Sequence, residues 1–141
     1  MSSTHDSLET WLRSYVERNG GVAGTVHLRG SDQLELKAAV NIPPKVVEIV
    51  RSIPKGKGMA GLAWERDDAV HTCNLKSDDS GDVRPGAKAV DANAAVAIPI
   101  HDPNGQVRGV VGIAYMGERE ITQAELDSLR SQAEQVQSAA G

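Results

Sequence analysis

His71 and Cys73, two residues with reactive side chains, stand two positions apart in the sequence. If residues 69–73 form a strand, both side chains point to the same face and could line one site. An imidazole beside a thiol could bind a metal or haem, or could activate the thiol as a nucleophile. The structural alternative is a lone cysteine that packs as a small hydrophobic side chain beside a hydrogen-bonded histidine. We favour the structural alternative, because a closed metal site needs about four ligands and no G-x-S-x-G or H-E-x-x-H motif is present.

Residues 56–61, GKGMAG, match the G-x-G-x-x-G pattern of dinucleotide-binding loops, and Asp78 and Asp82 follow about twenty residues later. A dinucleotide-binding loop follows a buried strand and opens the helix of a β-α-β unit. Here the pattern follows a short amphipathic helix that we expect to begin at Pro43-Pro44. We therefore interpret residues 56–61 as a structural turn.

Composition limits the classes of function. The chain has 141 residues, which suits one domain, and its net charge of -4 does not favour a basic nucleic-acid-binding face. With no Phe, two Trp and two Tyr, it offers little surface for stacking bases. Its apolar segments are shorter than the roughly 20 residues of a membrane helix, and the N-terminus does not resemble a signal peptide. A single cysteine fits a reducing compartment. We expect a cytoplasmic protein that binds neither nucleic acid nor membranes.

Hydrophobic periodicity predicts the elements that must position these residues. Hairpin-type turns between the strands indicate an antiparallel sheet flanked by helices, an α+β fold. The expected elements are a helix over 7–18, strands over 22–28 and 34–40, a short helix after Pro43-Pro44, a second over 59–66, strands over 69–73, 95–100 and 107–116, and a closing helix from Thr122.

The first and the closing helix both carry a narrow apolar seam. Thr122 and Glu125 form a capping box for the closing helix, and Ile121 and Leu126 form a hydrophobic staple. Such seams can pack on one face of the sheet or against a second copy of the chain. The residues expected in the seams, and at a dimer interface, are Leu8, Trp11, Leu12, Tyr15, Leu126, Leu129, Ala133 and Val136.

Three segments resemble motifs of the GAF domain family. Residues 53–63, IPKGKGMAGLA, resemble its IPxGxGxxGxA stretch. The segments AVAIPI at 95–100 and GQVRGVVGI at 105–113 resemble its VPL…G…GVLxL strand pair, and residues 121–129, ITQAELDSL, resemble the closing FTxxELxLL helix. The resemblance covers about residues 5–137, which makes 1–141 a single GAF-like domain. It implies a mainly antiparallel sheet of five to six strands, terminal helices on one face, and on the other a pocket formed by short helices and a long loop.

The long polar segment 74–93 has two interpretations that stay open. It could be a solvated loop of mixed charge, or a lid whose Asp and Arg side chains pair with a zwitterionic or polar ligand. By analogy with GAF pockets, the candidate ligand-binding residues are Trp64, His71, Cys73, Asp82, Arg84 and Tyr115.

One GAF subgroup, the free methionine-(R)-sulfoxide reductases, is enzymatic and needs several cysteines, because a second thiol must resolve the intermediate. The shared motifs place Ala60 at that subgroup's first cysteine, and Pro85 and Lys88 near its loop cysteines. Bilin attachment would also need a cysteine on the helix or loop beside the pocket, among aromatic side chains. We therefore expect no catalysis and no cofactor.

The sequence thus predicts a non-catalytic GAF-type sensory or regulatory domain. We expect a homodimer that binds a small polar metabolite and acts through a separate signalling protein. Two alternatives stay open: a reductase or other thiol enzyme that uses Cys73 with His71, and a dimerising scaffold with a vestigial pocket.

Overall fold

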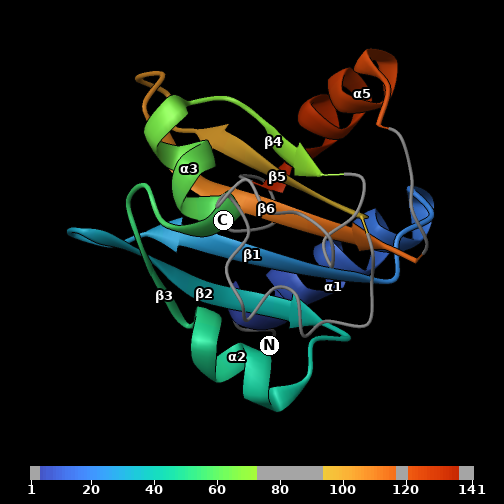
Figure 1. Ribbon diagram of the computed structural model, residues 1–141, viewed down its shortest axis with the longest axis horizontal. Helices are drawn as coiled ribbons and strands as arrows, with labels where there is room; N and C mark the ends of the chain where they lie inside the picture. Colours follow the sequence, from blue (N-terminus) through green and yellow to red (C-terminus); the bar gives the residue numbers. More distant parts are fainter. Residues whose placement is uncertain (1–3, 73–93, 117–120, 137–141) are drawn as a thin grey trace.

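The computed structural model describes residues 4–72, 94–116 and 121–136 (Figure 1). Four helices and six strands are found in these ranges. The helices are α1 (Thr4–Arg18), α2 (Pro44–Val50), α3 (Gly58–Arg66) and α5 (Gln123–Ala133). The strands are β1 (Ala23–Arg29), β2 (Gln33–Val40), β3 (Ser52–Pro54), β4 (Val70–Thr72), β5 (Ala94–His101) and β6 (Val107–Tyr115).

The described strands form one six-stranded sheet in the order β3-β2-β1-β6-β5-β4. Every neighbouring pair is antiparallel, which confirms the predicted α+β class. The sequence analysis missed only β3, which pairs Ile53 with Leu34 of β2 at the edge of the sheet. Three residues are too few for a period-two pattern, and Pro54, which has no N–H to donate, fits only an edge position.

Helices α1 and α5 cover one face of the sheet, as predicted, and α1 lies behind the sheet in Figure 1. The Tyr15 hydroxyl of α1 donates a hydrogen bond to the Leu129 carbonyl of α5 at 3.1 Å. Burial raises the pKa of this phenol above its ordinary value. Thr122 caps α5 as predicted, because its hydroxyl accepts a hydrogen bond from the Glu125 N–H at 3.2 Å.

The side chains of both seams pack inside the single chain. Trp11 is partly buried and stacks on Tyr15 with ring centroids 4.8 Å apart. A dimer through these helices would therefore use their outward side chains, which include Glu9 and Arg13 of α1 and Asp127 of α5. The homodimer stays a prediction. The other seam residues, all buried, are Leu8, Leu12, Tyr15, Leu126, Leu129, Ala133 and Val136.

The G-x-G-x-x-G segment forms the tight turn that opens α3. Gly56 and Gly58 have φ values of 83° and 66°, in the left-handed region that favours glycine. The Gly56 N–H donates to the Gly61 carbonyl at 2.9 Å. The sequence analysis placed this segment directly after a helix, but β3 lies between them. Since β3 is an antiparallel edge strand, the segment does not belong to a β-α-β unit.

Replacing Gly61 with alanine should destabilise the fold by about 2–3 kcal/mol, because the new Cβ would lie 2.5 Å from the rigid Pro54 carbonyl oxygen. Gly20→Ala is the control: its φ is 73° but nothing lies within 4 Å, so backbone strain alone should cost about 1 kcal/mol. Urea unfolding measures both free energies. Equal losses would contradict the close approach of α3 to β3.

Candidate functional site

A cavity of about 140 Å³ lies between the sheet and helices α2 and α3, on the face opposite α1 and α5. Figure 1 shows α3 in front of the sheet and α2 beside β2. Helix α2 contributes Val46 and Val50, and α3 begins at the cavity with Gly58, Met59 and Ala60. The other described residues that line it are Gly24, Thr25, His27, Ile42, Ile53, Ala95, Val96, Ala97, Val110, Gly112, Ile113 and Ala114.

The cavity exists because the middle of the sheet carries small side chains on this face. Gly112 of β6 pairs with Thr25 of β1 on one side and with Ala97 of β5 on the other. A Cβ at Gly112 would lie 2.8 Å from the Thr25 hydroxyl oxygen, so a larger residue at this position would require Thr25 to shift. Helices that rest on the larger side chains around this row leave a hollow above it.

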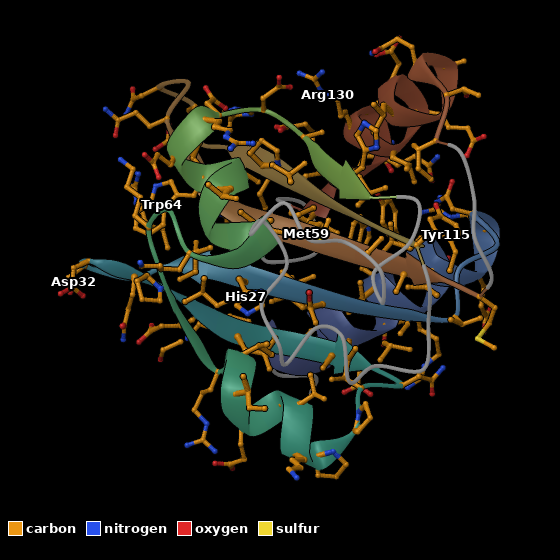
Figure 2. All side chains as sticks on the ribbon, in the orientation of Figure 1. His27, Asp32, Met59, Trp64, Tyr115 and Arg130 are labelled. Carbon is orange, nitrogen blue, oxygen red and sulfur yellow. The ribbon has the colours of Figure 1, made fainter. Side chains whose placement is uncertain are left out.

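His27 is the lining residue that carries an imidazole, and only 2% of its surface is exposed. It lies on β1, while Met59 lines the cavity from α3 (Figure 2). His27 Nε2 is 2.8 Å from the carbonyl oxygen of Val50 in α2. A carbonyl only accepts hydrogen bonds, so Nε2 carries the proton and Nδ1 carries a lone pair. Among the described residues, Nδ1 has no hydrogen-bond partner.

Burial sets the charge of this imidazole. It lowers the pKa of His27 to about 4, although the Val50 carbonyl opposes the shift by accepting a hydrogen bond. His27 is therefore neutral at neutral pH. Among the described lining residues, His27 thus contributes a buried, uncharged hydrogen-bond acceptor and Thr25 a hydroxyl, beside mainly apolar walls.

The structure does not bring the described candidates from the sequence analysis together at this cavity. Trp64 on α3 is half-buried and packs against the Lys55 ammonium, 5.4 Å from the ring centroid. His71 is exposed on β4, and Tyr115 is buried with the core under α1 and α5. Figure 2 shows Trp64 and Tyr115 at opposite sides of the molecule. The remaining candidates, Cys73, Asp82 and Arg84, lie outside the described residues.

Sequence reasoning missed His27, although a signal was present. Alternation along the predicted strand places Thr25 and His27 on one face and Val26 on the other. Because Val26 belongs to the core under α1, His27 had to face the opposite side of the sheet. The pairing of that face with Gly112 and Ala97 depends on strand order, which the sequence alone did not reveal.

A second histidine joins elements that lie far apart in the sequence. His101, at the end of β5, bonds through Nδ1 to the Glu134 carboxylate at 2.9 Å and through Nε2 to the Asp67 carboxylate. Partial burial alone would lower the pKa of His101, but the hydrogen bonds and charges of these two carboxylates outweigh it and raise the pKa. Within the described ranges, no group of three His, Cys, Asp or Glu side chains is arranged to hold a metal ion.

An antiparallel sheet with helices packed on one face and a cavity under short helices on the other is an architecture that can hold a small molecule. The family model described as the GAF domain matches residues 3–139, so the chain belongs to the GAF domain family. The GAF fold in general supports a small-molecule-binding regulatory or sensory role.

Solved structures show the same fold at low sequence identity. The GAF domain of an Acinetobacter phosphoenolpyruvate-protein phosphotransferase has a TM-score of 0.78 and 19% identity, over 99% of this chain and 83% of its own. The type II free methionine-R-sulfoxide reductase of Thermoplasma acidophilum has a TM-score of 0.72 and 15% identity, over 98% and 95%. A GAF domain/HD domain protein of Geobacter sulfurreducens has a TM-score of 0.77 and 12% identity, over 98% and 92%.

The comparison with curated proteins gives no significant match. No helix in the described part of the chain is long and apolar enough to cross a membrane.

The buried imidazole should make stability depend on pH in the acid range. An unfolded histidine has a pKa near 6.5, so the stability contributed by neutral His27 is complete above that pH and falls as the pH drops toward 4. Compared with His27→Gln, the wild type should lose about 2 kcal/mol of unfolding free energy between pH 7.5 and pH 5.

The difference between the two proteins isolates His27. His101 has a raised pKa, so its contribution is complete at low pH and is lost as the pH rises, but it is present in both proteins and cancels. Urea titrations at both pH values measure the difference. A difference that is constant with pH would contradict a buried, neutral His27.

Proposed function

We propose that this chain is a non-catalytic GAF-type sensory or regulatory domain that binds a small molecule in the cavity between the sheet and helices α2 and α3. The observation that carries the proposal is the cavity itself, with mainly apolar walls and the buried acceptor of His27. Ligand pockets have this character: apolar walls with a few polar groups that fix orientation. We also expect the domain to act through a separate signalling protein.

The packing around the cavity favours a ligand site over a vestigial pocket. Side chains around a void lose the dispersion contacts that a filled core would give them. An acceptor such as His27 Nδ1 loses a hydrogen bond when no donor reaches it. A bound molecule would remove both costs at once, whereas a collapsed scaffold would already have filled the space.

The residues around the cavity favour binding over catalysis. Ala60, where the resemblance places the first cysteine of the reductase subgroup, contributes a methyl group to the lining. The whole chain has one cysteine, so a thiol that attacked a sulfoxide would have no second thiol in the same chain to resolve it. A neutral imidazole with a pKa of about 4 is also a weak general base at neutral pH.

A variant that fills the cavity distinguishes a ligand-binding domain from a scaffold with a vestigial pocket. Ala95 lines the cavity and is half-buried, so Ala95→Leu should occupy part of the space and abolish binding. Ala39→Leu is the matched control, because Ala39 of β2 pairs with Thr25 of β1 but is not one of the residues that line the cavity. A compound at 100 times its Kd should stabilise the wild type by about 2.7 kcal/mol. Differential scanning fluorimetry with a panel of small metabolites measures the shifts.

We expect the same compounds to stabilise the wild type and Ala39→Leu, and none of them to stabilise Ala95→Leu. The scaffold alternative gives the opposite pattern. In that case no compound would stabilise the wild type, and Ala95→Leu would raise the melting temperature by improving the packing.

An assay for thiol-dependent reduction tests the enzymatic alternative. With free methionine-R-sulfoxide and dithiothreitol, we expect the wild type to reduce the sulfoxide no faster than the reductant alone, because the chain supplies a single thiol. Chromatographic detection of methionine measures the rate. Reduction above the background that disappeared in Cys73→Ser would replace the binding proposal with a thiol enzyme.

A further inference from the structure

We infer that the ligand of this cavity is a small, uncharged, mainly apolar molecule with one N–H or O–H group that donates a hydrogen bond to His27 Nδ1. The inference rests on the proposed function, because it takes the cavity between the sheet and α2 and α3 as the ligand site. It replaces the small polar metabolite expected from the sequence with a mainly apolar ligand.

The walls determine the polarity and the size of the ligand. None of the lining residues that the structure describes carries a formal charge at neutral pH, and apart from His27 only Thr25 has a polar side chain. An ionised ligand would lose its hydration without gaining an opposite charge from these described walls, so its binding is disfavoured. The cavity of about 140 Å³ is close to the roughly 150 Å³ of an engineered cavity that accepts benzene. A single ring with one substituent fits such a space.

His27 determines which hydrogen-bonding group the ligand must carry. The hydrogen bond from Nε2 to the Val50 carbonyl holds the proton on Nε2, so Nδ1 can only accept. A ligand hydroxyl or N–H would satisfy this acceptor, whereas a ligand carbonyl or ether oxygen would face its lone pair. The Val50 carbonyl belongs to α2, so the same histidine fixes the position of one wall of the cavity.

Three ring compounds of similar size test the ligand class on the full 141-residue chain. Phenol carries a donor, toluene replaces the hydroxyl with a methyl group, and benzoate is ionised at pH 7. Isothermal titration should show phenol binding about tenfold more tightly than toluene, because only phenol satisfies Nδ1. Benzoate should bind at least tenfold more weakly than phenol.

Two variants at one position separate the acceptor from the structural hydrogen bond. Gln places an amide N–H at the same number of bonds from Cβ as His Nε2, so His27→Gln can keep the bond to Val50 but has no acceptor at the Nδ1 position. Asn places its carbonyl oxygen at the same number of bonds from Cβ as His Nδ1, so His27→Asn restores an acceptor there. We expect the preference for phenol over toluene to disappear in His27→Gln and to return in His27→Asn.

Each remaining outcome has a defined meaning. Equal binding of phenol and toluene by the wild type, or an unchanged preference in His27→Gln, would overturn the hydrogen-bond assignment while leaving the cavity as a ligand site. Tighter binding of benzoate than phenol would overturn the uncharged class. The proposed function itself would fail if two results came together: none of the three compounds bound the wild type, and the metabolite panel gave the wild type and Ala95→Leu the same shifts in melting temperature.

Discussion

At the middle of the central sheet, the two faces carry side chains of very different size, and the rest of the structure depends on this difference. On one face, residues such as Val26, Val111 and Ile113 pack closely against α1 and α5. On the other face, Gly112 and its partners Thr25 and Ala97 form a row of small residues across the middle of the sheet. Helices α2 and α3 therefore rest on the periphery, and the unfilled centre becomes the cavity. The proposed binding cavity therefore lies on the face of the sheet opposite the closely packed core of α1 and α5.

Among the described residues that line the cavity, His27 is the one with an imidazole. It affects both the proposed binding site and the stability of the fold. Its hydrogen bond to Val50 ties β1 to the end of α2 and leaves Nδ1 as an acceptor. Burial keeps the ring neutral, because an imidazolium would lose its hydration where the described lining residues carry no opposite charge. Under the proposed function, the same residue would set the polarity of an acceptable ligand, and we expect it to lower the stability of the domain in acid.

The sequence predicted the fold well because the fold depends on local signals. Alternation, turn residues and the Thr122 cap placed nearly every element, and only the three-residue edge strand β3 was too short to detect. The site was harder, because it depends on strand order and on which side chains the helices leave uncovered. His71 was chosen for its chemical type but is exposed on β4. Tyr115 was another candidate, but side-chain alternation along β6 places it with Val111 and Ile113, on the face that the terminal helices cover.

The most direct test of this account is the protonation state of the His27 ring nitrogens in the ligand-free protein. Long-range ¹H–¹⁵N correlation by nuclear magnetic resonance at pH 7 distinguishes a protonated ring nitrogen from one with a lone pair. The account predicts a neutral ring with the proton on Nε2 and a lone pair on Nδ1, as the bond to the Val50 carbonyl requires. A proton on Nδ1, alone or together with one on Nε2, would contradict it, because the cavity would then offer a donor in place of an acceptor.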